Sequence, residues 1–476
     1  MLRLFLAALI TVPAAANAAD RPEPGKQGET LPGEARVLEQ PYSKGVTVIG
    51  HQPIDHRTGN VIMAWAGDCA YVGHGITLGP VGIAMVPHGP TSGVAVIDAK
   101  NPAAPRLVRY LQDKGALDAA ETLHAVTTRS RSVLAASTYG GVAGVNGPKE
   151  GWLGIYDVRE CANPRLMAEV KWPEPVHTIT VSPDGKRVYG TIINPFTASG
   201  GIAVMDISNM AAPRFVGRFA ATFADGKDYA FAPHEVSVSP DGRRIYAGVL
   251  ASKAGDIGVG IKPFPPSVVS LGPEAGAIYI LDSSDFVRGR KDPKLRLIGT
   301  AHHGGWHSVM QARIKGRPYL VGAGELGACP GAWPRLTDIS DEKNPRRAGE
   351  FRLAMNRPEN CPPRDAVEAG SNGVVGRIGV AASHFNDVDS ASNTRLGLFS
   401  FMYAGLRIAD LSDPMAPKEI AYFKPGDACM SHVRYRPKSG EIWFACMDSG
   451  FWVIKLDKTA KAGGSISPAT PVAASR

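Results

Sequence analysis

The sequence predicts an all-β protein in which seven four-stranded blades form a closed β-propeller. One recurring line supports this: a Gly, an alternating apolar strand, an Asp and a turn containing Pro, as in Gly93–Asp98 and Gly405–Asp410. A second pair of strands joined by a short turn lies upstream of each copy, most clearly in 177–190 and 234–248. Alternating apolar and polar residues are typical of strands, and Asp with Pro is typical of tight turns. Repeats at this spacing are typical of propellers.

The last repeat predicts how the ring closes. It begins at Gly450 and stops before its fourth strand, while the segment 45–51 is a spare apolar strand near the start of the chain. We expect this segment to complete the seventh blade, because joining the two ends removes the open sheet edges. An Asx-type turn explains the repeated aspartates, which we therefore interpret as turn formers rather than catalysts: Asp98, Asp157, Asp206, Asp282, Asp338 and Asp410.

These repeats resemble those of the LVIVD-repeat propellers, a family named for lines such as 405–410 (GLRIAD). The resemblance covers nearly the whole chain between its two ends. It implies a seven-bladed propeller and says little about activity, because one propeller fold hosts many functions.

The two ends of the chain are expected to lie outside the propeller. Residues 1–18 combine Arg3, a short apolar run and a small-residue site at 16–18, which is the pattern of a cleaved export signal. We interpret 19–43 as a linker, 44–457 as the propeller and 458–476 as a flexible tail rich in Ala, Gly, Ser and Pro. No later stretch has the length and composition of a membrane span. We therefore expect a periplasmic or secreted protein.

Composition and motifs narrow the class of partner. The net charge of +8 is spread along the chain without a Lys/Arg run, so nucleic acid is not expected as a partner. There is no phosphate-cradling glycine loop and no Gly-x-Ser-x-Gly motif, so nucleotide chemistry and serine hydrolysis are not predicted. A small-molecule substrate is expected, and the oligomeric state is left open.

Six cysteines in an oxidising compartment predict disulfides. Cys429 and Cys446 flank a turn almost symmetrically, so we expect a cross-strand bridge between them. Cys329 and Cys361 both fall in loops near the fifth blade and are a second candidate pair. Elimination then leaves Cys69 with Cys161.

Half of the twelve histidines are assigned to one position of the repeat, the start of the innermost strand: His124, His177, His234, His307, His384 and His432. In blade one, Asn60 is assigned to this position. Innermost strands line the central channel of a propeller. The long insertions of the chain join strands two and three, or one blade to the next, and so gather at the same end of the channel. A binding pocket is therefore expected on that face.

Two interpretations explain the histidines. Each imidazole could bond the backbone of a neighbouring blade and hold the blades together. Alternatively, three or four of them hold a transition metal ion, since imidazole is a common ligand of copper, zinc, iron and nickel. Because Asn60 interrupts the series, we expect the ligands in blades three to six.

The predicted site residues fall into three groups. The metal-ligand candidates are His177, His234, His302, His303, His307 and His384. The catalytic candidates are His307, Glu325 and His384. The substrate-binding candidates are Asn60, His124, Trp306 and His432.

The run 302–306 (HHGGW) is similar to the His-His-x-Gly-Trp element of selenium-binding proteins, whose exported bacterial members are copper-dependent methanethiol oxidases. The resemblance implies copper as the cofactor, with His302, His303 and His307 as ligands. The cysteine-rich segments of that family do not occur in this sequence.

Three functions therefore stay open. The first is a metal-dependent oxidase with copper or iron, and the second is a metal-dependent lyase or hydrolase with manganese, calcium or zinc. The third is a non-catalytic binding or scaffold module of the cell envelope. We favour a metal-dependent enzyme with copper as the first candidate.

Overall fold

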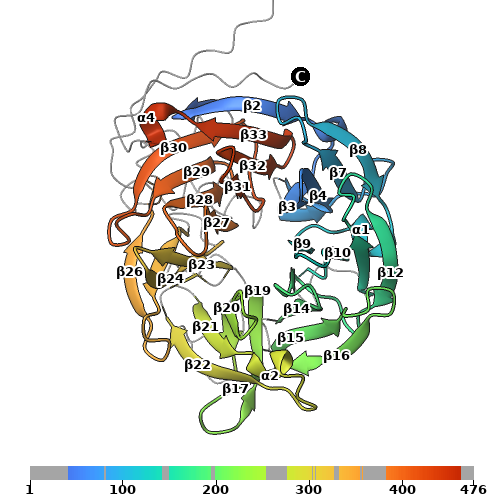
Figure 1. The fold of residues 1–476 in the computed structure, drawn as a ribbon, viewed down its shortest axis with the longest axis vertical. Helices are drawn as coiled ribbons and strands as arrows, with labels where there is room; N and C mark the ends of the chain where they lie inside the picture. The colour runs from blue at the N-terminus through green and yellow to red at the C-terminus, as the bar shows by residue number, and fades with distance from the viewer. Residues whose placement is uncertain are drawn as a thin grey trace, which may run out of the picture.

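Seven antiparallel sheets surround a central axis (Figure 1), which confirms the predicted all-β, seven-bladed propeller. The computed structural model describes residues 41–79, 82–141, 150–194, 199–253, 276–302, 304–305, 307–325, 332–353, 356 and 382–461. The export signal, most of the linker and most of the expected tail lie outside these residues, as do most residues of the long insertions. The expectation of a pocket built by those insertions stays a prediction.

Each blade runs from an inner to an outer strand. Blade one consists of β3 (Asn60–Ala66), β4 (Cys69–His74), β7 (Val94–Asp98) and β8 (Arg106–Leu111). Blade two consists of β9 (Leu123–Thr127), β10 (Ser132–Ser137), β11 (Trp152–Asp157) and β12 (Arg165–Lys171). Blade three consists of β13 (Ile179–Val181), β14 (Arg187–Asn194), β15 (Ser199–Asp206) and β16 (Arg214–Phe219). Blade four consists of β19 (Phe231–Val238), β20 (Arg244–Ser252), β21 (Ala277–Asp282) and β22 (Leu295–Ala301).

The remaining blades follow the same order. Blade five consists of β23 (Ser308–Ile314), β24 (Arg317–Ala323), β25 (Arg335–Asp338) and β26 (Arg346–Glu350). Blade six consists of β27 (Asn386–Val388), β28 (Leu396–Phe401), β29 (Gly405–Asp410) and β30 (Lys418–Lys424). Blade seven consists of β31 (Arg434–Arg436), β32 (Glu441–Cys446), β33 (Gly450–Leu456) and, from the start of the chain, β2 (Val46–Gln52).

A few short elements decorate this plan. The hairpin of β5 (Ile76–Gly79) and β6 (Gly82–Met85) follows β4, and β17 (Ala221–Thr222) and β18 (Asp228–Tyr229) extend blade four. The strand β1 (Tyr42–Lys44) lies where the sequence predicted a linker, and it pairs with β30 as a fifth strand of blade six. The short helices are η2 (Ile54–His56), α1 (Lys114–Leu117), α2 (Ser284–Val287) and α4 (Lys458–Lys461).

The two ends of the propeller pair with each other, as predicted. Strand β2 lies antiparallel to β33, from Val46 opposite Leu456 to Gln52 opposite Phe451, and Figure 1 shows both at the outside of one blade. Strand pairing between residues about 400 positions apart in the sequence therefore closes the ring. No interior sheet edge is left open at the seam.

The repeated aspartates form turns, as predicted. In each of the six, one carboxylate oxygen accepts a hydrogen bond from the backbone N–H two residues later, at 2.8 to 3.1 Å. This Asx turn ends the third strand of the blade and directs the chain toward the outer strand.

The core of the protein is a closed series of apolar clusters between blades. One cluster fills each of the seven interfaces between neighbouring sheets, including that of blade seven with blade one, where Met63 and Val72 pack with Trp443 and Val453. Alternation along each strand supplies these side chains to both faces of the sheet. Every blade is therefore stabilised by both of its neighbours.

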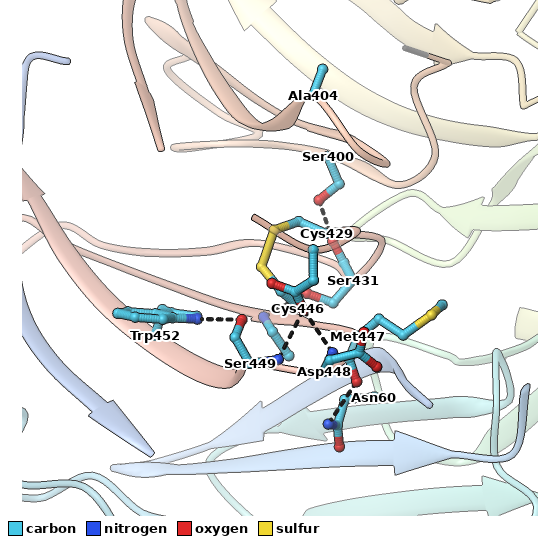
Figure 2. Close-up of a disulfide and its surroundings, with 12 residues drawn as sticks. Asn60, Ser400, Ala404, Cys429, Ser431, Cys446, Met447, Asp448, Ser449 and Trp452 are labelled. Atoms are coloured by element: carbon cyan, nitrogen blue, oxygen red, sulfur yellow. Dashed lines mark hydrogen bonds between the residues drawn. A yellow bond between two sulfur atoms is a disulfide. The ribbon is translucent and has the colours of Figure 1, made fainter. Parts of the chain in front are cut away.

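Two of the predicted disulfides are present. Cys429 is bonded to Cys446 beside the seam (Figure 2), and Cys69 is bonded to Cys161 between blades one and two. Cys329 and Cys361 lie outside the described residues. Within the described ranges, no helix has the length and apolar character needed to cross a membrane.

The two disulfides differ in the length of chain that they close, which predicts different contributions to stability. Cys69 and Cys161 are 92 positions apart, whereas Cys429 and Cys446 are 17 apart. Chain entropy then makes the first worth about 1.5 kcal/mol more than the second. We expect the double variant Cys69→Ala/Cys161→Ala to lose more free energy of unfolding in urea than Cys429→Ala/Cys446→Ala. Equal losses, or the reverse order, would contradict an entropic origin.

Candidate metal centre

The turn aspartates provide a register that is common to blades two to six. Each pairs with a residue of the second strand: Asp157 with Val133, Asp206 with Arg187, Asp282 with Arg244, Asp338 with Tyr319 and Asp410 with Leu396. Two residues further along, the second strand pairs with the innermost strand at His124, Thr180, Ser237, Met310 and Asp387. These five residues are therefore equivalent.

The residue three positions before each of these five equivalent residues, toward the N-terminus, occupies what we call the ring position of its blade. Five consecutive blades place a potential metal ligand there: Glu121, His177, His234, His307 and His384. The same count from Asp98 gives Val61 in blade one. In blade seven Lys455 takes the place of the turn Asp, and the count from it gives Ser431. The ring therefore holds four histidines and one glutamate.

The register predicted from the sequence was wrong for His124, His432 and Asn60. His124 lies three residues beyond the ring position, and His432 lies one residue beyond it. The amide of Asn60 is occupied structurally, since it accepts a hydrogen bond from Arg57 Nε at 2.8 Å and donates one to the carbonyl of Met447 at 3.0 Å. Figure 2 shows the second contact, which ties blade one to blade seven. The substrate-binding role predicted for Asn60 is therefore not supported.

The ring residues and Glu325 form two sets of buried ligand atoms. The first set is Glu121, His177 and His234, and the second is Glu121, His307, Glu325 and His384; within each, all ligand atoms lie within 4.8 Å of one another. Glu325 comes from the connection that follows β24, as a second carboxylate on the blade-five side. The structure thus brings together all three predicted catalytic residues and four of the six predicted metal ligands.

Distances within the first set are close to those of ligands on one ion. His177 Nε2 lies 2.8 Å from His234 Nε2 and 3.5 Å from Glu121 Oε2, and His234 Nε2 lies 3.7 Å from the same oxygen. With bonds of about 2.0–2.2 Å, two ligands of one metal ion lie about 3–3.5 Å apart. These three atoms can therefore share an ion with little movement.

The second set has similar spacing. His384 Nε2 lies 3.4 Å from Glu121 Oε1 and 3.6 Å from Glu325 Oε1, and His307 Nε2 lies 3.7 Å from Glu325 Oε2. Neither Glu121 Oε2 nor His384 Nε2 has a hydrogen-bond partner among the described residues. A buried polar atom without a hydrogen bond is costly, so a cation bound between these atoms would stabilise them.

Two of the imidazoles are also fixed by backbone, as the structural interpretation predicts. Nδ1 of His177 donates to the carbonyl of Gly141, and Nδ1 of His384 donates to the carbonyl of Met430, both at 2.8 Å. The acceptors are carbonyls, so Nδ1 carries the hydrogen and Nε2 is turned toward the cluster. Histidines that bind metals are commonly oriented in this way, by a hydrogen bond from the other ring nitrogen to a backbone carbonyl. Anchoring the blades and binding a metal are therefore compatible roles.

Burial lowers the pKa of some histidines of the cluster, whereas the two carboxylates raise the pKa of another. Burial, reinforced by the neighbouring imidazoles, holds the pKa of His234 and His307 well below the ordinary value. Burial alone would also lower the pKa of His384, but Glu121 and Glu325 outweigh it and raise that pKa to about 10. For Glu121, burial is outweighed by the adjacent histidines, chiefly His384, which lower its pKa. Protonated His384 therefore offsets part of the negative charge of the two buried carboxylates.

An apolar cluster encloses the remaining side of the ring. Val61 at the ring position of blade one packs with Ala120, Tyr139, Met430 and further residues of blades one, two, six and seven. The Tyr139 ring lies 5.1 Å from that of His177, measured between centroids. Such surroundings exclude water and strengthen the interactions of the charged groups beside them.

The structure describes only part of the 302–306 run, which is similar to an element of selenium-binding proteins. His302 is exposed and belongs to neither set of ligand atoms, so its predicted role as a ligand is not supported. It follows β22 at the outside of blade four, whereas His307 precedes the inner strand β23, and this places the two histidines apart. His303 and Trp306 lie outside the described residues.

A chamber lies in the central channel beside the ring position, lined by residues of the innermost strands. It has a volume of about 570 Å³ and is lined by His124, His432, Glu235, Asp387 and mostly apolar residues. Its lining includes Pro183 and Ser390 from turns between first and second strands, so it extends toward the face of short turns. The candidate substrate residues His124 and His432 therefore lie here. Along the strands, His124 is about 10 Å from the ring position of its blade and His432 about 3.3 Å from its own.

Three charged residues of this chamber, Glu235, His432 and Asp387, are in contact through His432. His432 contacts Glu235 Oε1 through Nε2 at 2.9 Å and Asp387 Oδ2 through Nδ1 at 3.0 Å. Burial would lower the pKa of His432, but the two carboxylates raise it to about 10. Burial raises the pKa of Glu235, against the effect of His432. Val181 N–H donates to His124 Nδ1 at 3.2 Å, an imidazole-to-backbone contact between neighbouring blades.

Glu121 and Glu235 are not among the site residues predicted from the sequence. His124, three residues after Glu121, has the side chain expected of the series in blade two and so conceals the equivalence of Glu121. Strict strand alternation would point Glu235 away from His234, but β19 carries a bulge in which His234 and Glu235 lie between the paired residues Pro233 and Val236. A bulge lets neighbouring residues point to one side. The spacing from the turn Asp is the signal that would have found Glu121.

Comparison with known proteins supports the fold alone. No family model matches the chain, and no curated protein matches it. The β-propeller domain of Cps50 (Swd1) from Myceliophteria thermophila is similar, with a TM-score of 0.51 and 10% identity over 87% of this chain and 100% of that one. Hydrazine synthase of Kuenenia stuttgartiensis has a TM-score of 0.48 and 12% identity, covering 84% and 97% of the two chains. The periplasmic gluconolactonase PpgL of Pseudomonas aeruginosa has a TM-score of 0.47 and 12% identity, covering 81% and 96%.

The environment of His124 predicts acid sensitivity. Burial, with a smaller effect of His432, lowers the pKa of His124 from 6.5 to about 3. Between these values the unfolded chain binds a proton that the folded protein does not, so the stabilisation is complete above pH 6.5 and is lost as pH falls toward 3. Each pH unit costs at most about 1.4 kcal/mol. We expect His124→Gln to unfold in urea with a weaker pH dependence between pH 6.5 and 4.5.

The matched control is His302→Gln, because His302 is exposed. It is expected to keep the wild-type dependence of unfolding free energy on pH. An unchanged slope in His124→Gln would show that this imidazole is protonated in the folded protein.

Proposed function

We propose that this protein is a metal-dependent enzyme whose metal centre is the cluster of Glu121, Glu325 and the four ring histidines, and whose substrate is a small molecule. The observation that carries this proposal is the convergence of six buried potential ligands on the channel axis from five consecutive blades. A purely structural ring of histidines needs no carboxylates. Here two carboxylates are buried with histidines as their ion-pair partners among the described residues.

The donor set limits the choice of metal. Imidazole suits copper, zinc, iron and nickel, and carboxylate suits manganese and other hard cations. The first set contains two histidines with one carboxylate, and the second contains two histidines with two carboxylates. Two histidines with a carboxylate are typical of non-haem iron and are also found at zinc. We therefore place iron, zinc and manganese beside copper, which was the first candidate from the sequence. Bound there, a metal supplies Lewis-acid activation of an oxygen atom or of water.

The chamber supports a small-molecule substrate. Its volume of about 570 Å³ is within the range of about 300–1,000 Å³ typical of small-molecule sites. It combines apolar walls with the convergent polar groups His124, His432 and Glu235. This combination favours a compact organic molecule over a protein or glycan partner, which is the alternative function as a binding module.

We further propose that the protein works in the periplasm or outside the cell. The two disulfides favour an oxidising compartment. The export signal predicted at residues 1–18 agrees with this location.

The test is elemental analysis of the full-length protein purified from its native compartment. We expect bound transition metal in the wild type and a loss of at least tenfold in the triple variant His177→Ala/His307→Ala/His384→Ala, because three of the four imidazoles are removed. Circular dichroism must show a retained β fold. Copper or iron would favour oxidation, and zinc or manganese would favour lyase or hydrolase chemistry.

The matched control is His302→Ala, which removes an exposed histidine outside both sets and is expected to keep wild-type metal content. Wild-type protein without metal, which also fails to bind added iron, zinc, manganese or copper, would favour the binding module. Full metal content in the triple variant would place the metal elsewhere.

A further inference from the structure

We propose that the cluster holds two metal ions bridged by the carboxylate of Glu121; this rests on the proposed metal centre. The first ion is held by His177, His234 and Glu121 Oε2. The second is held by His307, His384, Glu325 and Glu121 Oε1. The ligand class is a pair of divalent first-row transition ions.

The two oxygens of Glu121 face different partners. Oε2 is 3.5 and 3.7 Å from the Nε2 atoms of His177 and His234, while Oε1 is 3.4 Å from Nε2 of His384. A carboxylate that binds one ion in bidentate fashion directs both oxygens to the same ligand set. The division of the oxygens between two sets is the geometry of a bridge.

The size of the cluster also exceeds one coordination sphere. Opposite ligands of a single octahedral ion lie about 4–4.4 Å apart, so six ligands of one ion fall within 4.8 Å of one another. Here the six side chains divide into two sets at that distance, with Glu121 as the only shared member. Two-metal sites have their ions about 3.5–4 Å apart. A carboxylate bridge between the two sets fits that spacing.

Charge favours the same arrangement. The side chains of Glu121 and Glu325 are only 2% and 10% exposed, and both lie beside His384, so two negative charges share one enclosed space. Two buried carboxylates are costly without cations close to them. The described residues offer them histidines as ion-pair partners. Two divalent ions would compensate both carboxylates and leave the imidazoles neutral, as metal ligation requires.

The experiment uses Mn²⁺ as the probe with the full-length protein, stripped of metal and reloaded. We expect two Mn²⁺ per chain at saturation and an electron paramagnetic resonance spectrum of a spin-coupled pair. The double variant His307→Gln/Glu325→Gln removes two of the four ligands of the second ion, and His177→Gln removes one of the three ligands of the first, so each variant leaves the affected set with two ligands. Each variant is expected to bind one Mn²⁺ with the six-line spectrum of an isolated ion, and His302→Ala is expected to keep the coupled pair.

The outcomes separate this inference from the proposed function. One Mn²⁺ per chain in the wild type, lost in both variants, would overturn the bridged pair and leave the single metal centre standing. No bound metal would overturn both proposals. Two uncoupled ions in the wild type would overturn the bridge. If either variant fails to fold by circular dichroism, the stoichiometry and coupling of the wild type decide the question.

Discussion

Closure of the ring by β2 and β33 is the constraint on which the channel depends. In an open series of blades, the apolar faces of the first and last sheets would be exposed and the innermost strands could splay. Here an apolar cluster fills every interface between blades, including the one at the seam. Each innermost strand is therefore held at a fixed distance and level around the axis. One position of a repeat then meets its equivalents from the other blades, which is how side chains distant in sequence become neighbours.

Convergence on an axis also explains the unusual electrostatics of the cluster. Residues such as Glu121 and His384 would be ordinary on a surface, but the ring brings them together where Val61, Tyr139 and Met430 exclude water. Polar groups in such surroundings need full compensation. Backbone carbonyls provide it on the Nδ1 side of His177 and His384. On the Nε2 side, the partners among the described residues are other members of the cluster, and a metal ion there would satisfy these nitrogens and the carboxylates together.

The blade number, the closing strand, the turn aspartates and two disulfides could all be predicted, because each follows from a local pattern repeated along the chain. Four ring histidines and Glu325 were also recognised. The errors came from register: His124 resembled a ring residue although it lies three positions away, and Glu121 has a different side chain from its equivalents. The bulge at His234–Glu235 reverses the direction that alternation assigns to Glu235. Hydrogen bonding between neighbouring strands decides which residues are equivalent in the blades and where a bulge falls. The partner strands cannot be aligned residue by residue from a local sequence pattern.

The seam and the cluster lie in different parts of the ring. All proposed ligands come from blades two to six, which are continuous in sequence, whereas the ends of the chain meet in blade seven, beside blade one. Local unfolding starts most readily at chain ends. Opening of the pairing between β2 and β33 would therefore begin in blade seven, which carries none of the proposed ligands. The place where the ring can first open and the proposed metal site are thus on different blades.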